Sequence, residues 1–160
     1  MNAARLILPA AMLLAGLGLV SQAAPAAGPA QSGAALFMRC AACHTATGAG
    51  VPGAYPPLGA DFRKLATKPA GRRYLALAVI RGLNGPITVG GKPYRGMMPA
   101  QAGMDDAAVA AVLNHVGTAI AKTGPAFAPF NAAEVAGIRA GGASLSAADV
   151  ARLHAGAGGG

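Results

Sequence analysis

Cys40-Ala41-Ala42-Cys43-His44 says more about this protein than any other five residues of its 160-residue chain. Two cysteines separated by two residues and followed directly by histidine are the pattern at which haem is attached covalently. Each thiol can add to one vinyl group of the porphyrin, and His44 is then held where its imidazole can bind the iron. The motif therefore predicts one covalently bound haem c.

Other uses of the two thiols explain less. Cys40 and Cys43 are the only cysteines, and a disulfide between them would close too small a loop to stabilise much. A thioredoxin-like dithiol needs a βαβ context, which this helical, Gly- and Pro-interrupted sequence lacks. A structural zinc site needs four ligands, and only His115 and His154 remain, at unsuitable spacing.

The N-terminus resembles an export signal. Arg5 precedes an apolar stretch, 6–20, and Ser21-Gln22-Ala23 offers small residues for a signal peptidase. We expect a signal peptide over 1–23 and a periplasmic or otherwise extracytoplasmic protein. The alternative is a retained N-terminal anchor, although 15 residues interrupted by Pro9 are short for a membrane span. After cleavage we expect no stable membrane insertion.

Basic residues are concentrated in one part of a chain whose formal net charge is +8. Between residues 39 and 95 a single acid, Asp61, accompanies the basic residues Arg39, Arg63, Lys64, Lys68, Arg72, Arg73, Arg81, Lys92 and Arg95. Such a surface suits docking to an acidic redox partner, because complementary charge raises encounter rates. The other interpretation is a solvated surface that keeps the protein soluble. Nucleic acid is a poor partner for an exported chain with few aromatic residues.

The rest of the sequence predicts short helices and one hairpin. Ser32 can cap a helix from Gly33, residues 71–83 form a buried helix, and a tight turn at Gly90-Gly91 joins strands Ile87–Val89 and Lys92–Tyr94. Residues 105–121 have apolar side chains at three-and-four spacing and form the strongest predicted helix.

The predicted organisation has five parts. After the signal peptide, 24–31 is a flexible N-terminus, 32–124 the haem domain, and 125–155 an extension packed on that domain. Sequences that resemble capping boxes, Asn131 to Glu134 and Ser146 to Asp149, open two short helices in the extension. The Gly-rich residues 156–160 are expected to be a disordered tail.

The second axial ligand of the iron is expected from a methionine loop. Met98, before Pro99, lies between the hairpin and the long helix, and its thioether would raise the reduction potential. Met97 is the alternative. His115 flanks an apolar helix face, and we expect His154 to lie in a weakly ordered region. On the other side of the haem, the carbonyl of Pro56 is the candidate acceptor for the second ring nitrogen of His44.

The sequence resembles a class I monohaem cytochrome c, and within that family it is most similar to the longer soluble cytochromes c of Thermus type. The matching motifs are Gly33-x-x-x-Phe37, Cys40-x-x-Cys43-His44, Pro56-Pro57-Leu58, Gly82-Leu83-x-Gly85, Tyr94-x-Gly96-x-Met98 and Val112-Leu113-Asn114-His115. The resemblance implies an all-α fold around haem, thioethers at Cys40 and Cys43, axial ligands His44 and Met98, and contacts from Pro56 and Tyr94. One departure is the absence of tryptophan, which relatives often have where this chain has Ile120.

The expected function is single-electron transfer, not catalysis. By resemblance, the chain would pass electrons from a respiratory donor, such as a quinol–cytochrome c oxidoreductase, to a haem-copper terminal oxidase. An alternative is the electron-accepting subunit of a periplasmic dehydrogenase for sulfite, an alcohol or a sugar acid. A third hypothesis, a catalytic or gas-sensing haem, requires the methionine ligand to be absent or labile. We expect a monomer or one subunit of a heterodimer.

Overall fold

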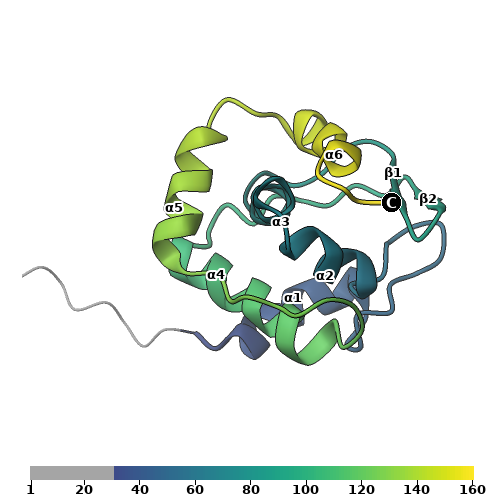
Figure 1. Ribbon diagram of the computed structural model, residues 1–160, viewed down its shortest axis with the longest axis horizontal. Helices are drawn as coiled ribbons and strands as arrows, with labels where there is room; N and C mark the ends of the chain where they lie inside the picture. Colours follow the sequence, from purple (N-terminus) through teal and green to yellow (C-terminus); the bar gives the residue numbers. More distant parts are fainter. Residues whose placement is uncertain (1–30) are drawn as a thin grey trace, which may run out of the picture.

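The computed structural model describes residues 31–160, which form a mostly helical fold with one small hairpin (Figure 1). This confirms the predicted all-α class. Its elements are α1 (Gly33–His44), α2 (Ala60–Ala66), α3 (Pro69–Arg81), β1 (Ile87–Val89), β2 (Lys92–Tyr94), α4 (Asp106–His115), a π-helical turn η1 (Val116–Ile120), α5 (Ala132–Gly141) and α6 (Ala147–Gly156). The predicted signal peptide 1–23, and all but residue 31 of the predicted flexible segment, lie outside the described residues.

Helices α1 and α4 cross in close contact because Gly33 has no side chain. A Cβ on Gly33 would lie 2.2 Å from the carbonyl oxygen of Ala111. Ser32 caps α1 by accepting a hydrogen bond from the backbone N–H of Ala35 at 3.2 Å, as the sequence predicted. Phe37 is buried beside this crossing, with its ring centroid 5.4 Å from that of His115. The crossing fixes the helix that carries the cysteine motif.

Helix α3 forms the centre of the core. All seven residues from Tyr74 to Ile80 are buried, and Figure 1 shows α3 in the middle of the fold, between α2, α5 and α6. The helix begins at Pro69, two residues before the predicted start, because proline is well suited to a first helical turn. It ends at Arg81, and the C-cap that follows is Gly82, whose φ of 76° is unfavourable for other residues.

The predicted long helix, 105–121, changes geometry before its end. Asp105 caps α4 through the N–H of Ala108, and the regular helix stops at His115. In the π-helical turn that follows, Gly117 lies against the ring of Phe127. A Cβ added to Gly117 would lie 2.4 Å from that ring. Thr118 donates a hydrogen bond to the carbonyl of Asn114 at 2.7 Å. Phe127, from the loop that follows, thus packs against the backbone of Gly117, in space that any other side chain at position 117 would occupy.

The hairpin forms from the two predicted strands, and in its register Ile87 lies opposite Tyr94. Gly90 and Gly91 have φ values of 57° and 71°, which the tight turn requires. Helix α2 was not predicted. It is short, and buried Phe62 and Leu65 hold it against α3, so tertiary contacts stabilise it more than its own sequence does.

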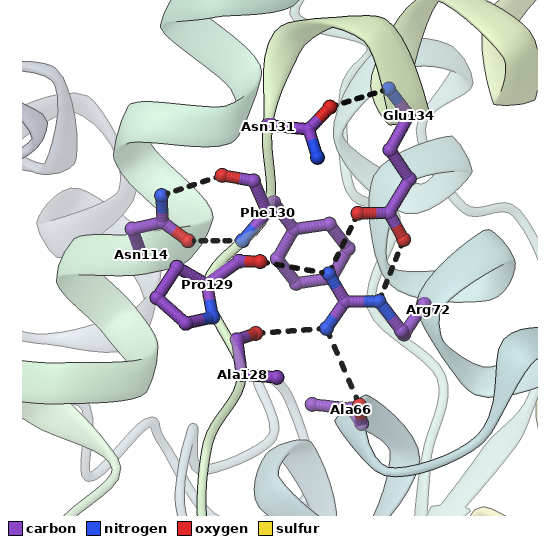
Figure 2. Close-up of polar contacts among 8 residues, drawn as sticks. All are labelled: Ala66, Arg72, Asn114, Ala128, Pro129, Phe130, Asn131 and Glu134. Atoms are coloured by element: carbon purple, nitrogen blue, oxygen red, sulfur yellow. Dashed lines mark hydrogen bonds and ion pairs between the residues drawn. The ribbon is translucent and has the colours of Figure 1, made fainter.

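Arginines from α2 and α3 bind the backbone of the C-terminal segment, residues 121–145. Figure 2 shows Arg72 with its guanidinium over the ring of Phe130, in contact with Glu134 and with the carbonyls of Ala128 and Pro129. Three other arginines donate to carbonyl oxygens of the same segment: Arg63 to Ala121 and Pro125, Arg73 to Gly141, and Arg81 to Leu145. Several of the basic residues therefore stabilise the fold. The surface available for docking is less basic than the count of basic residues between 39 and 95 indicated.

The side chain of Asn114 also holds this segment. Its Nδ2 donates to the carbonyl of Phe130 at 3.0 Å, and its Oδ1 accepts from the Phe130 N–H at 2.7 Å (Figure 2). Asn131 then caps α5 through the N–H of Glu134, and Ser146 and Asp149 form the full capping box of α6.

The predicted disordered tail, 156–160, folds back in the structure. Ala157 is buried, and Gly160 donates its N–H to Asp61 Oδ1 at 3.0 Å. The prediction of disorder followed from the glycine content of this tail. In the folded chain, the carboxylate of Asp61, 99 residues earlier, accepts a hydrogen bond from the last residue of the tail. Across residues 31–160, none of the helices has the length and apolar character needed to span a membrane.

Candidate functional site

Two adjoining pockets surround the cysteine motif. They contain about 640 and 720 Å³ of empty space, part of it open to solvent. Six residues line both: Cys40, His44, Pro56, Leu83, Ile87 and Met98. The pockets are therefore two parts of one cavity. Both are bounded by α1, the loop after it, Leu83 after the end of α3, the hairpin and the methionine loop, and the second is also lined by α2, α3, α4, η1 and α6.

His44 is the last residue of α1 and is buried in the wall of this cavity. Its Nδ1 lies 2.9 Å from the carbonyl oxygen of Pro56, the contact expected from the sequence. A carbonyl only accepts, so Nδ1 carries the hydrogen and Nε2 keeps its lone pair. Burial lowers the pKa of His44, and the Pro56 hydrogen bond partly opposes this. Both the low pKa and the tautomer suit an imidazole that binds metal through Nε2.

The loop that carries Pro56 folds tightly onto the end of α1. Gly50 donates its N–H to the carbonyl of His44 at 2.9 Å. Its φ is 67°, and a Cβ there would lie 2.4 Å from the carbonyl oxygen of Tyr55. Only glycine fits both conditions. This approach brings the Pro56 carbonyl to the imidazole.

Cys40 and Cys43 lie three residues apart on α1, one helical turn from each other, and both are partly buried. Cys40 lines both pockets and Cys43 lines the first. Burial raises the pKa of Cys40. The two cysteines thus line one cavity from a single helix turn, as two thioethers to one porphyrin require.

The two adjacent methionines occupy different environments. Met98 is partly buried, packs against the core and lines both pockets. Its backbone pairs with Leu83, N–H to carbonyl at 3.0 and 2.9 Å. Met97 is 67% exposed and lines only the first pocket. Pairing with Leu83 therefore directs Met98 inward and Met97 towards solvent.

Tyr94, the other predicted cofactor contact, ends strand β2 and is buried in the lining of the first pocket. The hairpin thus forms part of the cavity wall.

The residues present fit a covalently bound haem. The cavity lining is mostly apolar, as a porphyrin ring requires, and it carries two thiols, a histidine with a free Nε2 and a thioether. By contrast, no cluster of three or more His, Cys, Asp or Glu side chains within residues 31–160 could hold another metal ion.

Three polar residues of the cavity were not anticipated as parts of the site. Asp61, Tyr74 and His154 line the second pocket. His154 is only 3% exposed, not in a weakly ordered region as expected. A signal existed in the spacing, since Val150, Ala151 and His154 recur on one face of the helix that the Ser146 cap predicts.

Comparison with known proteins agrees with this site. The family model described as Cytochrome c matches residues 30–119, more than half of the chain, so the chain belongs to the cytochrome c family. Proteins of this family are electron-transfer proteins with covalent haem c, not enzymes.

Among individual relatives, the chain is similar to a cytochrome c-552 of Thermus thermophilus. The two are 43% identical over 135 residues, which covers 83% of this chain and 85% of the relative. A second Thermus thermophilus cytochrome c-552 is 44% identical over 110 residues, covering 68% of this chain and 84% of the relative. These matches support the Thermus type of class I cytochrome c that the motifs indicated.

Proposed function

We propose that this protein is an extracytoplasmic single-electron carrier whose haem is bound by Cys40 and Cys43 and ligated by His44 and Met98. One observation carries the proposal: His44 and Met98, from separate parts of the chain, line the same cavity as both cysteines. When bound, the haem supplies an iron that accepts and releases one electron.

The chain's own residues keep this exchange simple. The Pro56 carbonyl fixes the ring of His44, and the Leu83 backbone fixes Met98. With His44 and Met98 held in this way, both could stay bound to the haem iron in either oxidation state, and no position on the iron would be left open to a substrate. A methionine ligand stabilises ferrous iron more than ferric iron, so it would raise the reduction potential of the haem.

The rim of the first pocket supports docking of a redox partner. Arg39 lines this pocket, and Lys92 and Arg95 are exposed in and next to the hairpin that borders it. Within residues 31–160 these three side chains form no hydrogen bond and no ion pair. In contrast, Arg63, Arg72, Arg73 and Arg81 donate hydrogen bonds within the fold. We propose that Arg39, Lys92 and Arg95 meet an acidic surface on the partner, a haem-copper terminal oxidase or the protein that reduces this carrier.

The packing of the C-terminal segment supports a free carrier over a dehydrogenase subunit. The residues after 124 could have clamped a catalytic partner, but α5 lies against α3 and α4 of the same chain, and α6 lies against α3 and β1. An N-terminal signal peptide, 1–23, remains our proposal for export.

The absorption spectrum of the intact, exported protein tests this function. Oxidised protein should show the weak far-red band of a methionine–iron bond, and reduced protein should show no change on addition of carbon monoxide. A missing far-red band, or carbon monoxide binding at neutral pH, would instead identify an open-site haem.

Mass spectrometry of the unfolded protein tests the attachment. The wild-type chain should carry the mass of one haem after acid extraction, and a Cys40→Ser, Cys43→Ser double variant should carry none. A haem-free wild-type chain would contradict the proposal. Separately, copurification with one larger subunit would favour the dehydrogenase alternative, whereas equal reduction by unrelated donors would support a diffusible carrier.

A further inference from the structure

Asp61 and His154 form a buried polar pair in the wall of the cavity. His154 Nε2 lies 3.0 Å from Asp61 Oδ2, and the two side chains are only 4% and 9% exposed. Helix α6 supplies the histidine and α2 the carboxylate, from positions 93 residues apart. Moving such a pair out of water costs free energy, which is recovered only when the two groups have good hydrogen-bond geometry and further partners. The position of this pair in the cavity wall therefore suggests a function.

The pair lies in the second pocket, which His44 and Met98 also line. Most of that lining is apolar, so few groups there can screen a change of charge. Within residues 31–160 no hydrogen bond or ion pair joins His154 to either proposed ligand. The pair can therefore respond to charge at the iron through space, without altering the ligands themselves.

Few other titratable groups face His154. Tyr74 of α3 lies with its ring centroid 5.0 Å away, edge to face, and burial raises the pKa of its phenol, which stays neutral. Lys68, which precedes α3, lies beside Gly158 of the tail, where a Cβ on the glycine would be 2.8 Å from the lysine Nζ. Strand β1, which also packs on α6, has no titratable side chain. On α6 itself, Asp149 and Arg152 pair with each other at the surface.

The last residues cover the pair from solvent. The backbone of Gly159 lies against the imidazole, so that a Cβ there would be 2.3 Å from Nε2. Gly160 donates its N–H to the other carboxylate oxygen of Asp61. The carboxylate thus has two partners, and protonation of the imidazole decides whether the pair is neutral overall or negative.

We propose that Asp61 and His154 couple electron transfer to proton transfer in this protein. When one electron arrives from a donor redox protein, His154 takes up one proton from water, and it releases that proton when the electron leaves. The net charge of the cavity is then the same in both states. This inference rests on the haem attachment proposed above.

The direction of the coupling follows from electrostatics. A positive imidazolium in a weakly screened cavity attracts the added electron, so protonated His154 favours the reduced state. By linkage, the reduced state must favour protonated His154 to the same degree. The midpoint potential should therefore fall as the pH rises through the range in which the imidazole loses its proton.

Spectroelectrochemical titration of the holoprotein between pH 5 and 8 tests the coupling. The wild-type potential should decrease with pH, and His154→Gln and Asp61→Asn should each flatten the dependence. His115→Gln is the matched control, because His115 lines neither pocket, and it should keep the wild-type slope. A potential independent of pH in the wild type, or an unchanged slope in His154→Gln, would overturn the proposal.

A second measurement needs no variant that could fail to fold. NMR titration of the His154 ring in the wild-type protein should give a higher midpoint pH in the reduced form than in the oxidised form. Equal midpoints would overturn the coupling while leaving the carrier function intact. A chain without covalent haem would be recognised first by mass spectrometry, and that result would contradict the proposed function itself.

Discussion

Arg72 and Glu134 form a two-point ion pair between α3 and α5, with Nε–Oε1 at 2.6 Å and Nη2–Oε2 at 2.7 Å (Figure 2). The guanidinium also lies 3.8 Å above the Phe130 ring centroid and donates to backbone carbonyls of the same segment. A planar fork is needed to make all of these contacts at once. One side chain thus joins the central helix to the C-terminal segment.

Replacing this fork should destabilise the whole fold. Arg72→Lys keeps the charge but loses the paired geometry, and we expect the free energy of unfolding of the holoprotein to fall by about 2–3 kcal/mol. Urea unfolding followed by circular dichroism measures this. Arg152→Lys is the control, because Arg152 is 72% exposed in its pair with Asp149, and it should change stability by less than about 0.5 kcal/mol. Equal decreases in unfolding free energy in the two variants would show that the paired geometry of the Arg72 guanidinium adds no stability beyond its charge.

The same pair should make stability depend on acid. The hydrogen bond from Arg72 holds the pKa of Glu134 below its ordinary value. Because the folded pKa is lower than the unfolded one, the stabilisation is complete above pH 5 and is lost as the pH falls through the folded pKa. Between pH 5 and 3, Glu134→Gln should therefore lose less stability than wild type, measured by urea unfolding at each pH. Parallel pH curves would contradict this.

Substitution of each methionine should separate the two candidate ligands. Met98→Ala should abolish the far-red band of the oxidised protein and lower the midpoint potential, since the thioether stabilises ferrous iron. Met97→Ala should leave both unchanged, because Met97 is mostly exposed. The reverse pattern would assign the ligand to Met97 and would mean that the Leu83–Met98 pairing does not set the loop's register.

The crossing of α1 and α4 should not tolerate a methyl group. Gly33→Ala would place a Cβ 2.2 Å from the Ala111 carbonyl, and separating the helices should cost about 1–3 kcal/mol of stability. Gly137→Ala is the matched control: it lies in α5 with no other atom within 4 Å of a built Cβ, and alanine there should stabilise by about 0.5–1 kcal/mol. Thermal unfolding of both variants measures the difference. A stabilised Gly33→Ala protein would mean that the crossing is looser than the structure shows.

Local sequence patterns predicted the elements that depend on neighbouring residues. Ser32, Asp105 and Ser146 each cap a helix through an N–H three residues away, and the hairpin register follows from Gly90 and Gly91. In contrast, α2 and the π-helical turn were not predicted. Phe62 and Phe127, packed by distant parts of the chain, determine those two segments, and no short window of sequence contains that information.

The sequence by itself determined the chemistry of attachment, because covalent haem needs two thiols and an imidazole within five consecutive residues, Cys40 to His44. It also predicted the Pro56 contact and favoured Met98. Only the tertiary structure separated Met98 from Met97, through backbone pairing with Leu83, and turned several predicted surface arginines into internal contacts. It alone brought Asp61 and His154 together in the cavity, because a hydrogen bond across 93 residues exists only once the chain has folded.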